Sequence, residues 1–138
     1  MADDELWAAV TATSLGTLAT IRKDGRPQLS DVDYTPSPGL LRISTRTTLA
    51  KVRNLRRDPR ASLRVLAPGG YAVVEATAEL TSPAQRPDDA VVEELIEVYR
   101  RIRGKEHPDW ADYRRAMVAD GRLVLRLHVE RLYGWIAR

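Results

Sequence analysis

The chain has 138 residues, a net charge of +3 and a pI near 9.5, which is typical of one soluble globular domain. Cysteine is absent and histidine occurs only twice, so disulfides, thiolate metal sites, cysteine nucleophiles and a histidine-rich metal centre are excluded. The sequence has no apolar run of about 18 residues and no charged-then-apolar leader. We therefore expect no membrane segment and a cytoplasmic location, and we treat residues 1–138 as a single domain.

The N-terminal part of the sequence predicts one short helix followed by strands. Residues 1–13 have helical spacing, and from Thr17 the apolar period changes to two. Lys23-Asp24-Gly25 is typical of a hairpin turn, and the proline- and glycine-rich residues 35–39 predict a plain turn. Three strands are expected here, at residues 17–22, 26–34 and 40–44.

The C-terminal part begins with a short helix, residues 49–57. Two strands follow, at 61–66 and 71–80, and then two helices. Asp88 or its neighbour caps the first helix and Gly104 ends it, while Pro108 opens the second and Gly121 stops it. The last strand alternates clearly, with one apolar face made of Leu123, Leu125, Leu127 and Val129.

This order of elements predicts a mainly β fold with some α structure. Tight turns imply antiparallel pairing, and a small closed or split barrel hides most strand edges. We expect a six-stranded antiparallel split β-barrel, with a short inserted helix and a helical pair before the last strand.

The segment between Ile43 and Val65 is the most informative part of the sequence. Unpaired N–H groups at a helix start, hydroxyl donors and the early Lys51 together predict a phosphate site. The alternative is a simple helix cap from a threonine beside a solvated lysine. The run that precedes the helix is Ser44, Thr45, Arg46, Thr47 and Thr48.

A phosphate ligand indicates a nucleotide-like cofactor or a nucleic acid. The arginines of the same segment also fit a solvated helix face, and aromatic residues, which stack on bases, make up only 6% of the chain. We expect no nucleic acid partner. These arginines are Arg53, Arg56, Arg57 and Arg60.

Other polar groups predict no further site. Asp31 and Asp33 share a strand face, but no further acid or histidine is placed to complete a metal site. His107 is interpreted as a residue at a helix start and His128 as a surface residue. Neither histidine completes a Ser–His–Asp triad, so no catalytic side chain is assigned.

Five stretches together carry a family resemblance over nearly the whole chain, in the correct order. They are Leu15–Ile21, Asp24–Ser30, Ala50–Ser62, Tyr71–Glu75 and Val129–Trp135. In these residues the sequence resembles the pyridoxamine-5′-phosphate-oxidase-like split β-barrel family. Within that family it is similar to the flavin/deazaflavin oxidoreductase B branch, which binds coenzyme F-420.

The resemblance implies a homodimer in which each cofactor lies in a groove shared by both subunits. It implies that Lys51 contacts the cofactor phosphate and that Gln28, Ser30 and Asp31 lie near the tricyclic ring. Members of the branch have an arginine two positions before the lysine, where this chain has Leu49. The expected cofactor-binding residues are Lys51, Ser44, Thr45, Arg46, Gln28, Ser30, Asp31, Arg57 and Tyr71.

The activity implied is hydride transfer from reduced F-420 to an electron-poor small-molecule acceptor, such as a quinone or an enone. Two alternatives remain open at this stage: an FMN-binding oxidase or reductase of the same fold, and an F-420-binding protein without turnover. The proton donor is also open, with solvent, Tyr34 and Ser30 as the choices.

Overall fold

The computed structural model describes residues 2–137, which form seven strands and four helices. The helices are α1 (Asp3–Thr11), α2 (Ala50–Arg57), α3 (Ala90–Arg103) and α4 (Trp110–Ala119). The strands are β1 (Leu15–Ile21), β2 (Pro27–Asp33), β3 (Thr35–Ser37), β4 (Leu40–Arg46), β5 (Arg60–Ala67), β6 (Gly70–Leu80) and β7 (Arg122–Ile136).

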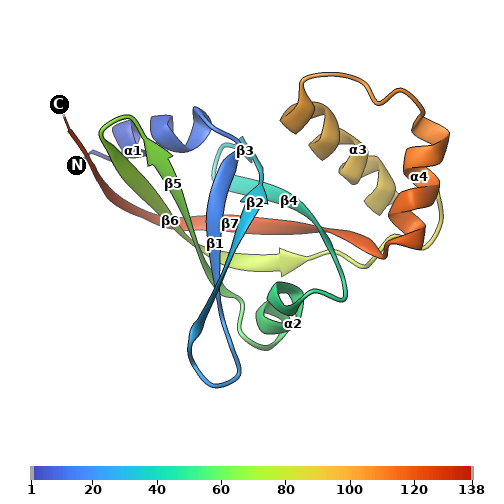
Figure 1. Cartoon of the computed structure of the whole chain (residues 1–138), viewed down its shortest axis with the longest axis horizontal. Helices are drawn as coiled ribbons and strands as arrows, with labels where there is room; N and C mark the ends of the chain where they lie inside the picture. The colour runs from blue at the N-terminus through green and yellow to red at the C-terminus, as the bar shows by residue number, and fades with distance from the viewer. Residues whose placement is uncertain (1, 138) are drawn as a thin grey trace.

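The strands form one antiparallel sheet in the order β2-β1-β5-β6-β7-β4-β3. The two edge strands, β2 and β3, are consecutive in the chain, so the sheet must curl to bring its edges near each other. Figure 1 shows this curl, with β1 and β2 crossing in front of the long β6–β7 pair. The mainly β, split-barrel class expected from the sequence is confirmed.

The concave side of the curled sheet holds the larger core. Alternate residues of each strand point inward, as the period of two requires, and α1 closes one end through Leu6 and Val10. The Tyr34 hydroxyl also points into this core and donates to the Val10 carbonyl at 2.5 Å. Among the fully buried members are Leu18, Leu63, Val74, Leu125 and Leu127.

Two expectations were wrong: the sheet has seven strands instead of six, and Pro108 precedes α4, whose N-cap is Asp109. Residues 35–37, expected in a turn, form β3, in which Pro36 pairs with Leu41 of β4. Because β3 is an edge strand, the missing N–H of Pro36 leaves no neighbour unpaired. β7 runs to Ile136. Near its end, Gly134 has a φ of 154° and passes so close to β6 that a Cβ would lie 2.4 Å from the Tyr71 carbonyl oxygen.

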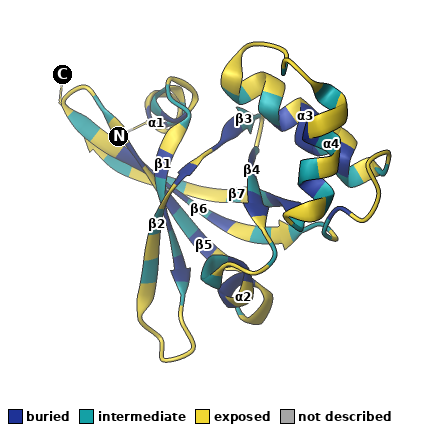
Figure 2. Ribbon diagram, turned by 45° about the vertical axis from the view of Figure 1, so that its right-hand side comes forward, coloured by how far each residue is buried: buried dark blue, intermediate teal, exposed yellow. Residues whose placement is uncertain are grey.

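The helical pair forms a second layer on the outer face of β4 and β7 (Figure 2). Asp89 caps α3 by accepting from Val92 N at 2.9 Å, and Gly104 ends α3 in the left-handed region, both as expected. Ion pairs fix α3 to the sheet: Arg42 donates twice to Glu97, at 3.1 and 3.2 Å, and Arg126 pairs with Glu94. This layer creates a wall opposite α2.

Within residues 2–137, no helix is both long and apolar enough to span a membrane.

Candidate functional site

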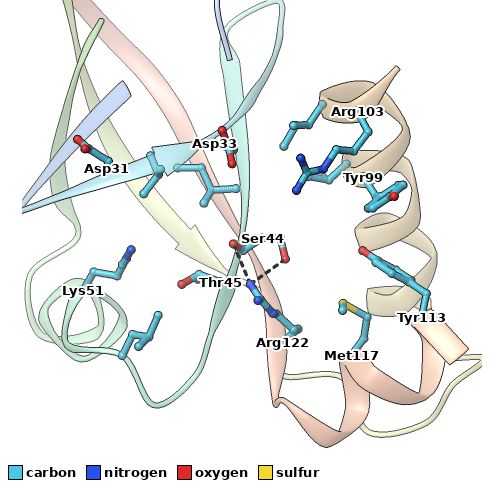
Figure 3. A pocket seen from close by; sticks show the side chains of 15 residues that line it. Asp31, Asp33, Ser44, Thr45, Lys51, Tyr99, Arg103, Tyr113, Met117 and Arg122 are labelled. Carbon is cyan, nitrogen blue, oxygen red and sulfur yellow. Dashed lines mark hydrogen bonds between the residues drawn. The ribbon is translucent and has the colours of Figure 1, made fainter. Parts of the chain in front are cut away.

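A cavity of about 410 Å³ lies between the sheet, the start of α2 and the helical pair. In Figure 3, Lys51 and Asp31 lie on one side of this cavity, the side chains of α3 and α4 lie on the other, and Arg122 lies between them. The lining residues come from β2, β4, the α2 start, α3, α4 and the start of β7.

Two cations, Lys51 and Arg122, and the Thr45 side chain line the cavity near the sheet. Lys51 comes from the first turn of α2, and Arg122 enters from the first residue of β7. The Arg122 Nη1 atom donates weakly to the Ser44 carbonyl and hydroxyl, at 3.4 and 3.5 Å. The Thr45 hydroxyl and the Arg122 Nε atom are buried without a hydrogen-bond partner. Such unsatisfied donors fit an anionic ligand.

The start of α2 adds backbone donors to this group. Leu49 is the N-cap residue, and no side chain caps the helix. The threonine cap, the alternative interpretation of this segment, is therefore absent: the Thr47 hydroxyl instead accepts from Arg56 at 3.0 Å. The uncapped first turn leaves N–H groups and the positive end of the helix dipole for a ligand.

α2 is held in place by polar contacts on its other side. The Asn54 amide is buried and donates to the Thr20 hydroxyl at 3.1 Å and to the Gln28 Oε1 atom at 3.4 Å. Arg57 donates to the Asn54 Oδ1 atom at 3.1 Å and to the Ile21 carbonyl at 3.0 Å. Gln28 and Arg57 thus attach α2 to the β1–β2 hairpin and do not line the cavity.

The pKa of Lys51 is lowered, first because burial removes water from the ammonium and second because Arg122 repels it. Both causes make the charged form of Lys51 less favourable in the free protein than in water. A bound anion would offset both penalties. Side chains with perturbed pKa values cluster at functional sites.

The other expected site residues lie in different places. Asp31, Ser44 and Thr45 line the cavity with Lys51. Arg46 is exposed and faces Asp120 at 4.0 Å, while the Ser30 hydroxyl is buried, without a partner, and outside the cavity. Tyr71 is 39% exposed, lies at the start of β6, where it pairs with Trp135, and does not line the cavity.

The expectation that Tyr34 could donate a proton to the ligand was wrong. It is fully buried, its hydroxyl donates to the Val10 carbonyl, and burial raises its pKa. A neutral hydroxyl that is already bonded inside the core cannot reach a ligand in the cavity.

Arg122 and the helical wall were missed by sequence reasoning. The face of the last strand that carries Arg122 and Arg126 was not assigned to a site, although Val124 between them is buried. This valine is the one signal that another layer covers that face. The remaining wall residues are Val98, Tyr99, Ile102, Arg103, Tyr113 and Met117.

Within the described part of the chain, no group of three or more histidine, aspartate or glutamate side chains could hold a metal ion. Asp31 and Asp33 line the same cavity. The local charge is therefore mixed, with cations at the sheet side and on α3.

The family is decided by a match that spans almost the entire chain. A family model described as pyridoxamine 5′-phosphate oxidase matches residues 2–136. The chain belongs to the pyridoxamine 5′-phosphate oxidase family. The resemblance seen in the sequence is thereby confirmed at family level.

Solved structures agree on the fold of this family member. A conserved hypothetical protein of Mycobacterium tuberculosis is 26% identical with a TM-score of 0.76, covering 99% of this chain and 85% of that one. A protein described as an F420 reductase is 22% identical with a TM-score of 0.66, covering 91% and 94%. A FAD-binding protein of Mesorhizobium loti is 21% identical with a TM-score of 0.72, covering 100% and 96%.

Heme proteins share the fold as well. A heme storage protein of Vibrio cholerae is 14% identical with a TM-score of 0.67, covering 97% of this chain and 93% of that one. These likenesses show a common architecture that carries more than one kind of cofactor. None of these likenesses assigns a cofactor to this chain.

Proposed function

We propose that this family member is a coenzyme F-420-dependent oxidoreductase that reduces an electron-poor organic acceptor of the quinone or enone type. The observation that carries the proposal is the group of Lys51, Arg122 and Thr45 beside the uncapped start of α2. These groups fit the phosphate of a flavin-like cofactor. Arg122 would take the place of the arginine that members of the branch have at the position of Leu49.

The cationic group would act by binding and orientation. Bound F-420 supplies two-electron hydride chemistry from its ring. Lys51, Arg122 and the α2 N–H groups would hold the phosphate, and the cavity walls would fix the ring and exclude water. Asp31, which lines the cavity from β2, would be a polar neighbour of the ring.

FMN also has a phosphate and is the competing cofactor. F-420 differs in carrying a polyanionic tail, which agrees in sign with the basic side chains around α2. Neither histidine lines the cavity as a possible axial ligand of heme: His107 packs among aromatic rings, and His128 contacts Glu79 at 2.9 Å.

The proposal is tested by measuring the binding of F-420, FMN and heme to the same preparation. We expect quenching of F-420 fluorescence with saturable binding, and weaker binding of FMN. Oxidation of reduced F-420 by a panel of quinones and enones then tests turnover. Tighter binding of FMN or heme would contradict the F-420 assignment, and binding without any turnover would indicate a carrier.

We also propose that the protein is a homodimer through the outer face of the sheet. The register of the sheet places Asp31, Thr17, Arg64, Val73 and Tyr133 in one row across five strands. A neighbouring row on the same face pairs Leu66 with Tyr71 and Trp135. The large apolar side chains exposed on this face are Leu15, Leu29, Leu66, Tyr71, Tyr133 and Trp135.

A second copy of the chain suits this surface better than water does. Exposed apolar side chains over several strands indicate an interface, and acidic Asp31 and basic Arg64 on one row can meet each other across a two-fold axis. Asp31 also lines the cavity, so the face and the cavity are continuous. A partner there would complete the cofactor groove.

We expect Leu66→Asp to convert the dimer to a monomer, because a buried charge at the interface would lack a partner. Leu66 is 66% exposed in the single chain, so folding itself should be preserved. Sedimentation velocity measures the change, with Ala111→Asp on the exposed part of α4 as the control. A monomeric unsubstituted protein, or an unchanged dimer in Leu66→Asp, would contradict this interface.

The affinity for the phosphate group should fall in the alkaline range at a lower pH than for an ordinary lysine site. Only the ammonium form of Lys51 binds the anion, and its lowered pKa makes it lose its proton earlier as pH rises. Titration of inorganic phosphate by calorimetry at increasing pH measures this decline. In Lys51→Arg the decline should disappear, because a guanidinium stays charged; a decline that persists would assign it to another group.

A further inference from the structure

The cavity has two unlike walls. The proposed phosphate site uses the sheet side, around Lys51, Thr45 and Arg122. The opposite wall, which we call the helical wall, faces it across the cavity in Figure 3. The helical wall consists of Val98, Tyr99, Ile102, Arg103, Tyr113 and Met117.

Arg103 is the unpaired cation of the helical wall. It is the last residue of α3, it is exposed, and no described residue forms a hydrogen bond or ion pair with it. The other α3 arginines are engaged: Arg100 contacts Glu106 at 2.6 Å, and Arg101 contacts Glu97 at 3.1 Å. A cavity-lining guanidinium with all its donors available is suited to a carboxylate, sulfonate or enolate.

The rest of the helical wall is aromatic and rigid. The rings of Tyr99 and Tyr113 meet edge to face at 5.3 Å, and the rings of Tyr99 and Trp110 meet edge to face at 5.6 Å. The buried Tyr113 hydroxyl donates to the Leu95 carbonyl at 3.1 Å, which fixes its ring. Met117 adds an adaptable apolar contact. Fixed apolar surfaces of this kind bind flat conjugated rings at small entropic cost.

The acids of the cavity set the direction of a charged ligand. Asp31 and Asp33 lie on β2, on the sheet side of the cavity. They would repel an anionic substituent of the ligand from the part of the sheet side that β2 forms. With the proposed phosphate site filled, Arg103 is the remaining cation for such a substituent.

We propose that the helical wall is the acceptor subsite, that it takes a planar conjugated ring with an anionic substituent, and that Arg103 binds this substituent. The inference rests on the proposed function in assigning the sheet side of the cavity to the cofactor. It narrows the acceptor class from electron-poor rings in general to anionic ones.

The test compares two probes of similar ring size by calorimetry: 2-hydroxy-1,4-naphthoquinone, which is anionic at neutral pH, and the uncharged 2-methyl-1,4-naphthoquinone. We expect the anionic probe to bind more tightly. Arg103→Gln should weaken the anionic probe about tenfold and the neutral probe less than about twofold. Arg115→Gln, an exposed arginine on α4 outside the cavity, is the control with the same charge change.

Three results would overturn the inference. The first is equal binding of both probes, and the second is weakening of the anionic probe by Lys51→Ala in place of Arg103→Gln. The third is an Arg103→Gln variant that loses affinity for F-420 but not for the probes, which would assign Arg103 to the cofactor tail. If F-420 fails to bind while Arg103 still selects the anionic probe, the proposed function fails and the subsite stands.

Discussion

Lys51→Ala should bind F-420 about 30-fold more weakly than the unsubstituted protein, because it removes one charge-assisted contact to the phosphate. The effect is limited because Arg122 and the α2 N–H groups remain. The dissociation constant is measured from the quenching of F-420 fluorescence. Lys23→Ala, in the exposed β1–β2 turn, makes the same change in net charge away from the cavity.

The same substitution should leave the fold intact or slightly more stable. In the free protein the Lys51 ammonium is disfavoured by burial and by Arg122, as its lowered pKa indicates. Removing it relieves both penalties, so the midpoint of urea denaturation should not fall. Unchanged affinity in Lys51→Ala would place the phosphate elsewhere, and a loss of both affinity and stability would indicate a structural role.

Much of the fold follows from local patterns in the sequence. The period of two marks β1, β2, β5, β6 and the start of β7, and the Asp24-Gly25 turn joins the first pair. β3 escaped prediction because Pro36 and Gly39 are typical of turns, and only its place at a sheet edge permits the proline. Local propensity does not contain that information.

The candidate site could be predicted only in part. Lys51, Ser44 and Thr45 lie close in sequence, so a helix start and two hydroxyls were enough to find them. Arg122 joins them because β4 pairs with β7, which brings Arg46 opposite Arg122. Of these two arginines, Arg122 lines the cavity and Arg46 faces Asp120. Which one points inward depends on the layer formed by α3 and α4, and the sequence does not state where that layer packs.

Arg42→Met should lower the free energy of unfolding by about 2 kcal/mol, because it breaks the ion pairs that hold α3 to β4. Arg42 is only 8% exposed. The cost stays below that of stranding a buried charge, since Glu94 keeps Arg126 and Glu97 keeps Arg101. Arg101→Met is the matched control: it removes a half-exposed contact to the same Glu97 carboxylate and should cost less than about 0.5 kcal/mol.

The difference between Arg42→Met and the unsubstituted protein should depend on pH in a defined direction. The hydrogen bond from Arg42 is the largest cause that lowers the pKa of Glu97. A carboxyl group with a lowered pKa stabilises the fold at pH values above its ordinary pKa. This stabilisation is lost as the pH falls through the lowered pKa. Urea denaturation at neutral and acidic pH should therefore show the two proteins converging in acid. Equal destabilisation by Arg42→Met and Arg101→Met, or a gap that widens in acid, would show that this ion pair does not hold the helical wall against the sheet.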